Sequence, residues 1–342
     1  MSLWLEVPLT ALGSVLLWIA GTTFFDAVHW VLHLMLGSRW RALRLLAWPH
    51  GVHHRFLDGG LRVCWEYQRR NVFCHLVPEY LTQLAFSAAL LLLLPVPVVL
   101  GCALLQTVVF GFLLSRRGLD INHRPIETLD AYRPSLLCPP AYHALHHVYP
   151  GAYFSAYNKL VDWAVGGGAW LPGRRFALSG EEMPFGRALR ERLAREGVAG
   201  IRALGGAGDP ALAGVDVLVL CDPAAKEEPL VEAFVRATRA RQLPPEVWAL
   251  HERPVDGLAR HYYRDLRVCY RSIVLPGAAG IDSAAARRAA RVALFFIRRG
   301  FHFVPTRLGP AALLDFRRFR RSPPLRPAGV QRARSRAELV AV

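Results

Sequence analysis

The stretch "PPAYHALHHVYP" (residues 139–150) places one histidine three residues ahead of an adjacent histidine pair. The same spacing occurs in "PHGVHHRF" (residues 49–56), and "HWVLH" (residues 29–33) holds two histidines four residues apart. Of the 13 histidines in the 342-residue chain, ten precede residue 148, and eight of these belong to the three motifs. The eight are His29, His33, His50, His53, His54, His143, His146 and His147. A pattern used three times in one chain indicates one shared role.

Clustered imidazoles are typical of metal centres. On a helix, residues three and four positions apart share a face, and imidazole binds iron, zinc, copper and nickel. Eight histidines exceed what one metal needs, so we expect two metals, with positions left for water or dioxygen. The six cysteines show no C-x-x-C spacing, which disfavours a cysteine-based zinc or iron–sulfur site and favours reduced thiols. We interpret the isolated His251, His261 and His302 as core residues.

The hydrophobic share of the chain, 53%, is high for a soluble protein and indicates that part of it lies in lipid. Leu9–Phe25 is uncharged and, with its flanks, is long enough for a first spanning helix. A cleaved signal peptide is the alternative, but it would need a basic start, whereas the first arginine is Arg39. Val77–Ser115 contains one charged residue, Glu79, and is interrupted at Pro95–Pro97. This segment predicts two further spanning helices joined by a tight turn.

Basic residues gather between the first and second predicted spans and again after the third. They are Arg39, Arg41, Arg44, Arg55, Arg62, Arg69, Arg70, Arg116 and Arg117. The positive-inside rule places this side in the cytoplasm. We therefore expect a multi-pass integral membrane protein whose histidine motifs and C-terminal region are cytoplasmic, with the Pro95–Pro97 turn on the other side.

The three histidine motifs, separated by an apolar hairpin, resemble the fatty acid hydroxylase/sterol desaturase superfamily of integral-membrane di-iron oxygenases. The likeness is greatest to the plant wax-forming proteins and related two-domain bacterial members, and it covers roughly residues 10–170. It implies that His123, in "DINHRPIE", is a further ligand, and that His75, in "CHLVPEY", binds metal or supports a ligand. One departure is that 16 residues separate His33 from His50, more than expected in the plant proteins.

The resemblance implies two non-haem iron ions, dioxygen as co-substrate and no catalytic side chain beyond the metal ligands. The substrate would be a lipid taken from the bilayer, fatty acyl or sterol- or hopanoid-like, and hydroxylation and desaturation remain open. Electrons would come from a ferredoxin- or cytochrome-type donor with its reductase. Polar residues near the motifs would fix the imidazoles, and the candidates are Asp26, Asp120, Asn122 and Asp162, with structural capping as the alternative role for Asp120 and Asn122. The alternatives are a non-catalytic metal-binding membrane protein and a bifunctional oxygenase–dehydrogenase.

After the connector near Gly168 the long uncharged segments end, and strand and helix patterns alternate. "VDVLVL" (residues 215–220) and "YRSIVLPG" (residues 270–277) predict buried strands, with "EEPLVEAFVRATRARQ" and "AAARRAARVALFFIRRG" as helices. The fold class is therefore mixed. We predict an α-helical membrane domain over residues 1–170, a smaller α/β, reduced Rossmann-like domain over 171–321, and a basic, disordered tail over 322–342.

The α/β domain resembles a reduced short-chain dehydrogenase and is not expected to bind a nicotinamide cofactor. The glycines of "LGGAGDPALAG" (residues 204–214) are not preceded by a clear strand and do not open a helix as G-x-G-x-x-G does. The tyrosine–x3–lysine pair of such enzymes is absent, because Tyr263 is followed by Arg267 and Tyr262 by Leu266.

The formal net charge of +16 comes almost wholly from arginine, since the chain has two lysines. Nucleic acid is one partner class that such a charge suggests. A membrane protein with a basic cytoplasmic tail has a nearer partner in anionic lipid headgroups, and a solvated tail without a partner is the alternative. We therefore expect a membrane partner and no nucleic acid.

Overall fold

The computed structural model describes residues 3–119, 122–123, 137–138, 140–221, 227–238, 245–251, 268–275, 283–301 and 303–304. They form two compact units, the first from residues 3–123 and 142–161 and the second from residues 137–141 and 162–304. A helical unit followed by a parallel α/β sheet confirms the predicted fold class. The predicted domain limits stay predictions, and the tail at 322–342 lies outside the described residues.

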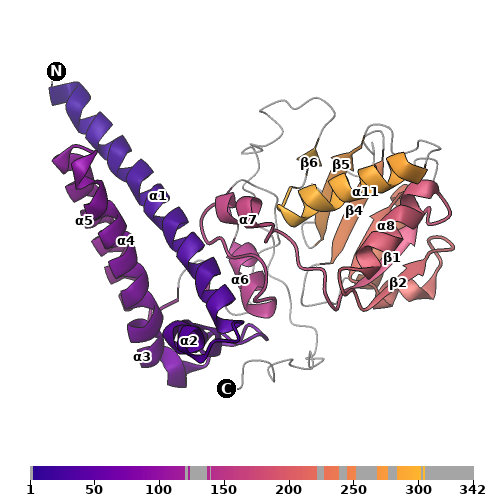
Figure 1. Cartoon of the computed structure of the whole chain (residues 1–342), viewed down its shortest axis with the longest axis horizontal. Helices are drawn as coiled ribbons and strands as arrows, with labels where there is room; N and C mark the ends of the chain where they lie inside the picture. The colour runs from indigo at the N-terminus through magenta and orange to yellow at the C-terminus, as the bar shows by residue number, and fades with distance from the viewer. Residues whose placement is uncertain are drawn as a thin grey trace. The chain divides into compact units, whose positions relative to one another are not determined.

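Three helices lie side by side in the first unit (Figure 1): α1 (Leu3–Leu36), α4 (Val77–Ala89) and α5 (Val96–Ser115). Two of them, over Trp4–Leu36 and Val96–Ser115, are long and apolar enough to cross a membrane. The third predicted span is shorter, because α4 has 13 residues between a π-helical turn, η2 (Val72–Leu76), and a 3-10 turn, η3 (Leu90–Leu92). The structure thus supports two of the three predicted spans by length and composition.

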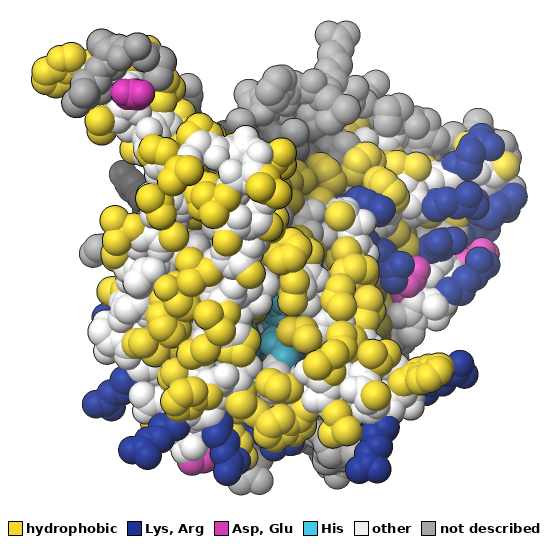
Figure 2. Space-filling view, turned by 60° about the vertical axis from the view of Figure 1, so that its left-hand side comes forward, with side chains coloured by type: hydrophobic (Ala, Val, Ile, Leu, Met, Phe, Trp, Pro, Cys, Tyr) yellow, Lys and Arg dark blue, Asp and Glu magenta, His cyan; other side chains and the backbone are white. Residues whose placement is uncertain are grey.

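The outer faces of these helices are apolar. Leu16 on α1 and Leu104 on α5 are more than half exposed, which is typical of a surface that contacts lipid. Figure 2 shows this hydrophobic surface, with Lys and Arg side chains gathered at one end of it. Between the helices the contacts are partly polar: Ser14 Oγ donates to Val98 O at 3.0 Å, and Gln106 Nε2 donates to Ser87 Oγ at 3.0 Å. Such bonds hold helices together where lipid offers no hydrophobic driving force.

Shorter helices bring the histidine motifs to one end of the bundle. They are α2 (Arg41–Phe56), η1 (Trp65–Tyr67), α3 (Gln68–Asn71) and α6 (Pro140–Val148). The buried face of α2 includes His50 and His53, so this amphipathic helix packs its histidines inward.

The second unit contains a six-stranded parallel sheet in the order β2-β1-β3-β4-β5-β6. The strands are β1 (Arg175–Ser179), β2 (Gly200–Ala203), β3 (Val217–Leu220), β4 (Glu246–His251), β5 (Cys269–Val274) and β6 (Phe303–Val304). The strands predicted at 215–220 and 270–277 correspond to β3 and β5. All four residues of β3 are buried, as expected for a parallel sheet covered on its two faces.

Helices cover the two faces of this sheet. α8 (Pro184–Ala194) and α11 (Ser283–Arg298) share one core with it, and α9 (Glu227–Thr238) with the 3-10 turn η5 (Pro210–Gly214) share the other. The short helix α7 (Leu160–Val165) lies at the start of the unit.

The glycine stretch at residues 204–214 corrects one expectation. It follows a strand, β2, which the sequence analysis did not recognise because the edge strand "GIRA" is half exposed and lacks a run of large apolar residues. The stretch then forms η5, capped by the Asp209 carboxylate, which accepts from Ala211 N at 2.8 Å. Because it leads into β3 and not into an α-helix, it does not build a dinucleotide loop.

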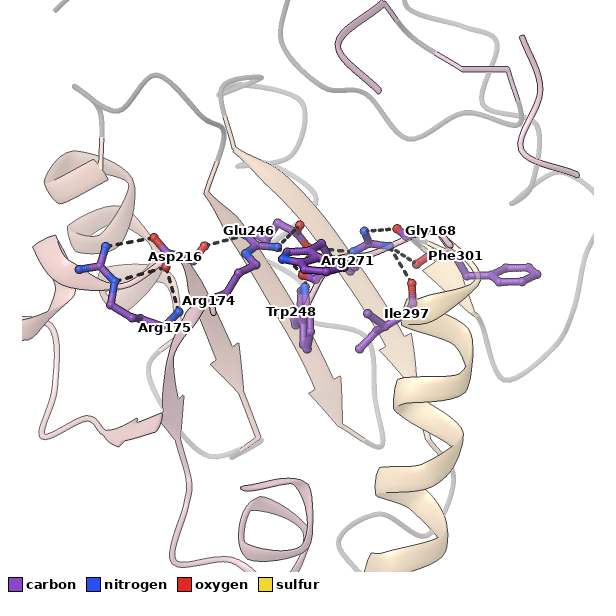
Figure 3. Close-up of polar contacts among 10 residues, drawn as sticks. Gly168, Arg174, Arg175, Asp216, Glu246, Trp248, Arg271, Ile297 and Phe301 are labelled. Atoms are coloured by element: carbon purple, nitrogen blue, oxygen red, sulfur yellow. Dashed lines mark hydrogen bonds and ion pairs between the residues drawn. The ribbon is translucent and has the colours of Figure 1, made fainter. Parts of the chain in front are cut away.

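A buried ion network lies at the start of β4 (Figure 3). Glu246 accepts from Arg174 Nη1 at 2.6 Å, from Arg271 Nε at 3.1 Å and from Trp248 Nε1 at 2.8 Å. Burial alone would raise the pKa of Glu246, but the two arginine charges and these hydrogen bonds outweigh it and lower the pKa to about 2. Arg271 also donates to Gly168 O at 3.1 Å, so the network ties the connector to the sheet.

Candidate metal centre

Nine histidines of the first unit converge in two groups whose ligand atoms, within each group, all lie within 4.8 Å of one another. The five-histidine group contains His29, His33, His50, His54 and His146, and the four-histidine group contains His53, His123, His143 and His147. These are the nine residues that the sequence motifs and the resemblance single out as ligands. Two adjacent groups of this composition are able to bind two metal ions.

Helical spacing explains how each H-x-x-H-H motif serves both groups. On α2, His50 and His54 are one turn apart and join the five-histidine group, whereas His53 points to the other. On α6 the roles are reversed, because His143 and His147 join the four-histidine group and His146 the five-histidine group. One H-x-x-H-H motif on a helix can therefore supply ligands to two neighbouring metal sites.

The distances inside the five-histidine group fit a cation. The Nε2 atom of His33 lies 2.8, 2.9 and 3.1 Å from the Nε2 atoms of His50, His146 and His54, respectively. A ring nitrogen has either one proton or one lone pair, so only one of these three contacts can be a hydrogen bond. A metal about 2.0–2.1 Å from each nitrogen would place ligands at right angles about 3 Å apart. The observed spacing is therefore that of ligands around a shared ion.

Two histidines of this group are oriented by one loop. Nδ1 of His29 donates to Phe154 O at 3.1 Å, and Nδ1 of His146 donates to Ala152 O at 2.7 Å. Between these carbonyls lies Tyr153, a buried residue with a φ of 61°, in the left-handed region that non-glycine residues rarely adopt. This turn lets the carbonyls of two nearby residues accept hydrogen bonds from two different imidazoles, and it leaves Nε2 of each ring for a metal.

The four-histidine group is oriented in the same way. Nδ1 of His147 donates to Leu57 O at 2.8 Å, and Nδ1 of His53 donates to Asn71 Oδ1 at 3.0 Å. The sequence analysis did not single out Asn71, which stands 17 residues beyond the nearest motif without a pattern of its own. The carbonyl of Leu57 could not have been found from sequence, because every residue has one.

The remaining ring nitrogens are buried. Nε2 of His29, His53 and His147 is buried without a hydrogen-bond partner among the described residues. Leaving such atoms unpaired costs about 1–3 kcal/mol each, and a metal would satisfy them. Burial lowers the pKa of His50, His53 and His147 well below the ordinary value, with the neighbouring imidazoles adding to the effect. The rings are therefore neutral at physiological pH, which is the form that binds metal.

His75 lies beside the centre but in neither group. Its ring stacks on that of His53 with centroids 3.6 Å apart, and its Nε2 lies 3.5 Å from Glu79 Oε2. It belongs to the π-helical turn Val72–Leu76, a feature often found at functional sites. The structure thus places His75 against a candidate ligand ring.

The polar residues proposed to support ligands differ in their surroundings. The carboxylate of Asp26 accepts from Ala156 N at 3.2 Å, so it braces the loop that supplies carbonyls to the histidines. Asn122 is fully buried next to His123 in the chain. Asp162 is buried at the start of the second unit, and its backbone carbonyl accepts from Gly166 N at 2.8 Å. Asp120 lies outside the described residues.

Comparison with known proteins gives one informative match. No family model matches the chain, and no solved structure matches it. A curated protein of Synechocystis sp., monoglucosyldiacylglycerol epimerase, is 32% identical over 217 residues, which covers 58% of this chain and 50% of the relative. The chain therefore spans about half the length of this relative. The name of this relative specifies an enzyme that acts on a glycolipid, and the described residues of the present chain include two histidine groups that are able to hold metal ions.

Proposed function

We propose that the protein is a membrane-bound di-iron oxidoreductase that uses dioxygen to hydroxylate or desaturate a lipid. The observation that supports it most is the pair of histidine groups built from the same helices, α2 and α6, with α1 completing one of them. All-imidazole sites suit iron, and the histidine-only donor set disfavours a purely structural zinc site. Two irons held there would supply the oxidative chemistry that an unactivated lipid C–H bond requires.

The chain's own residues prepare the site for that chemistry. Backbone carbonyls and Asn71 hold the imidazoles in one tautomer, and burial keeps them neutral. The apolar outer faces of α1 and α5 would contact lipid, so a substrate could reach the centre without leaving the bilayer. We propose that the substrate is a bilayer lipid and that the centre lies at the cytoplasmic side.

Electrons would come from a separate ferredoxin- or cytochrome-type donor with its reductase. In the described part of the α/β unit, the loop after β1 is unsuited to a dinucleotide. Pro184 in the first turn of α8 removes a backbone N–H that a pyrophosphate would need. The start of α8 still packs closely against the loop after β1, because a Cβ on Gly186 would lie 2.1 Å from Gly180 O. The geometry of a dinucleotide fold is therefore partly kept without its phosphate site.

A second candidate is epimerisation of a glycolipid, which the name of the Synechocystis relative favours. That reaction would remove hydrogen from a carbinol carbon to give a ketone and return it to the opposite face. It consumes no net dioxygen, and it needs an acceptor that holds the hydride between the two steps. Oxidation by dioxygen and epimerisation therefore differ in whether dioxygen is consumed, and not only in substrate.

The experiment is to supply the purified, iron-loaded full chain in lipid nanodiscs with ferredoxin, its reductase and isotopically labelled dioxygen. Lipids are then analysed by mass spectrometry. Gain of a labelled oxygen atom supports hydroxylation, and loss of two hydrogens supports desaturation. An unchanged mass with an altered sugar configuration supports epimerisation. No change in any lipid class, with two irons bound, would contradict an enzymatic role and favour the non-catalytic alternative.

A further inference from the structure

The helices α8 and α11 lie side by side over one face of the sheet (Figure 1). Their inner sides fill the core, with Leu189 on α8 and Ala290 and Leu294 on α11 almost fully buried. Their outer sides form a surface that we call the basic helix face. It consists of Arg187, Arg190, Arg192, Arg287, Arg288, Arg291, Val292, Phe295, Arg298 and Arg299.

An apolar strip crosses this face. Among the described residues of 162–304, Val292 (43%) and Phe295 (48%) are the large apolar side chains that remain exposed. They lie on the same side of α11 as Arg288 and Arg291, one turn away along the helix. The guanidinium of Arg299 stands over the Phe295 ring at 3.7 Å from its centroid. Exposed apolar side chains among cations on one helix face are an arrangement that suits contact with a lipid headgroup layer.

The carboxylates of the described residues neutralise only part of the charge of this face. Helix α11 has four arginines and no acidic residue, and α8 has three arginines and one glutamate. Arg298 pairs with Glu196 at 2.6 Å, and Arg190 pairs with Glu181. In the described chain, no carboxylate forms an ion pair with Arg287, Arg288 or Arg291. The face therefore presents uncompensated positive charge around its apolar strip.

We propose that the basic helix face docks on the anionic headgroups of a lipid bilayer, with Val292 and Phe295 entering the headgroup layer. Arginines with an interposed aromatic ring match such a surface, because cations bind the phosphates while the ring enters the interface. Two helices of the same chain are long and apolar enough to span a membrane, and with the proposed membrane location a bilayer would be present as a partner. The chain's own C-terminal segment is excluded by charge, since residues 305–342 contain nine arginines and two acidic residues.

The opposite face of the sheet gives an internal control. Helix α9 covers it and includes the acidic Glu228 and Glu232 on its outer side. Ala194 ends α8 and Ala237 lies in the last turn of α9, and the two alanines are exposed. A fluorophore attached at position 194 or 237 would measure how close the corresponding face lies to a bilayer, without altering the residues of the basic helix face. This docking rests on the membrane location that is part of the proposed function, and it is independent of the metal centre and of the reaction.

The test uses the full chain in nanodiscs, with Cys64 and Cys74 replaced by serine and a fluorophore on Ala194→Cys or, as the matched control, on Ala237→Cys. Lipids with a nitroxide on the headgroup quench a fluorophore close to the surface. On changing from phosphatidylcholine to a mixture with phosphatidylglycerol, we expect quenching at 194 to rise by roughly threefold or more and to fall again with salt. At 237 we expect no change.

Charge and ring variants complete the test. Arg288→Glu with Arg291→Glu should abolish the lipid-dependent quenching, Arg288→Lys with Arg291→Lys should retain it, and Phe295→Ser should weaken it. Thermal unfolding of each variant shows that the α/β unit still folds. Equal quenching in the two lipid mixtures, equal quenching at 194 and 237, or no effect of the glutamate pair would overturn the proposal. So would a response at 194 to a soluble acidic protein and not to phosphatidylglycerol.

Discussion

The two units of this protein bury polar side chains in opposite ways. In the first, nine imidazoles of like character converge, and the ring nitrogens of His33 and its neighbours approach to 2.8–3.1 Å with at most one proton to share. In the second, Glu246 stands between Arg174 and Arg271, so opposite charges meet and the carboxylate is satisfied. A buried cluster that satisfies itself is a structural element, whereas one that is completed only by a cation is a binding site.

This difference predicts what each cluster loses on mutation. Removing a histidine should change what the protein binds more than how stably it folds. Removing the glutamate should change stability and leave the metal content of the first unit as it was. Each prediction below tests one side of that contrast.

The largest effect is expected for His146→Ala combined with His147→Ala, which removes one ligand from each histidine group. We expect about two metal ions per chain in the parent, iron when active, with zinc able to replace it during overexpression. The double variant should lose most of the metal and all activity, as measured by inductively coupled plasma mass spectrometry and the lipid assay. His261→Ala, outside the three motifs, is the control. Unchanged metal content in the double variant would refute the dinuclear centre.

The next effect is expected for Glu246→Ala. The variant leaves the buried Arg174 and Arg271 without their carboxylate, and breaking such a buried pair costs about 3–5 kcal/mol. We expect the α/β unit to unfold at a lower denaturant concentration while metal content stays the same. The matched control is Asp216→Asn, whose partner Arg175 is 55% exposed, and there the loss should stay below about 1 kcal/mol. Loss of metal in Glu246→Ala would show that the two clusters are not separable.

The histidine cluster could be predicted from the sequence, whereas the Glu246 network could not. The histidine motifs were readable because helical geometry alone turns the spacing 50, 53, 54 into an i, i+4 pair and one residue that faces elsewhere. Glu246 and Arg271 are 25 residues apart on neighbouring strands, and only the register Glu246↔Cys269 brings them together. β2 was missed for a related reason, since its pairing with β1 and not its composition makes it a strand.

The pH dependence of the α/β unit should follow Glu246. Its pKa is lowered from 4.5 to about 2 in the folded chain, so the folded state favours the charged form. The stability this contributes is fully present above pH 4.5 and is lost as the pH falls toward 2, a total of about 3 kcal/mol by linkage. The protection of β4 and β5 amides against hydrogen exchange, corrected for the pH dependence of the intrinsic exchange rate, should fall over this interval in the parent. In Glu246→Gln the fall should be smaller, and an equal fall in the two proteins would assign the effect to other carboxylates.

The smallest expected effect concerns Asn71. It belongs to the histidine cluster, but, as in the Glu246 network, a side chain and not a backbone carbonyl accepts the hydrogen bond. Asn71 Oδ1 accepts from His53 Nδ1 at 3.0 Å, so it fixes the tautomer that leaves Nε2 for a metal in the four-histidine group. Removing such a support typically weakens metal binding 10–100-fold, and we expect Asn71→Ala to do so for one of the two ions, measured by competition with a graded chelator. Asn71→Asp keeps an acceptor at that position and should restore retention of the ion, which loss of packing alone would not explain. If Asn71→Ala released the two ions equally, or neither, the separate orientation of the two groups would be wrong, and the histidines would have to be treated as one undivided site.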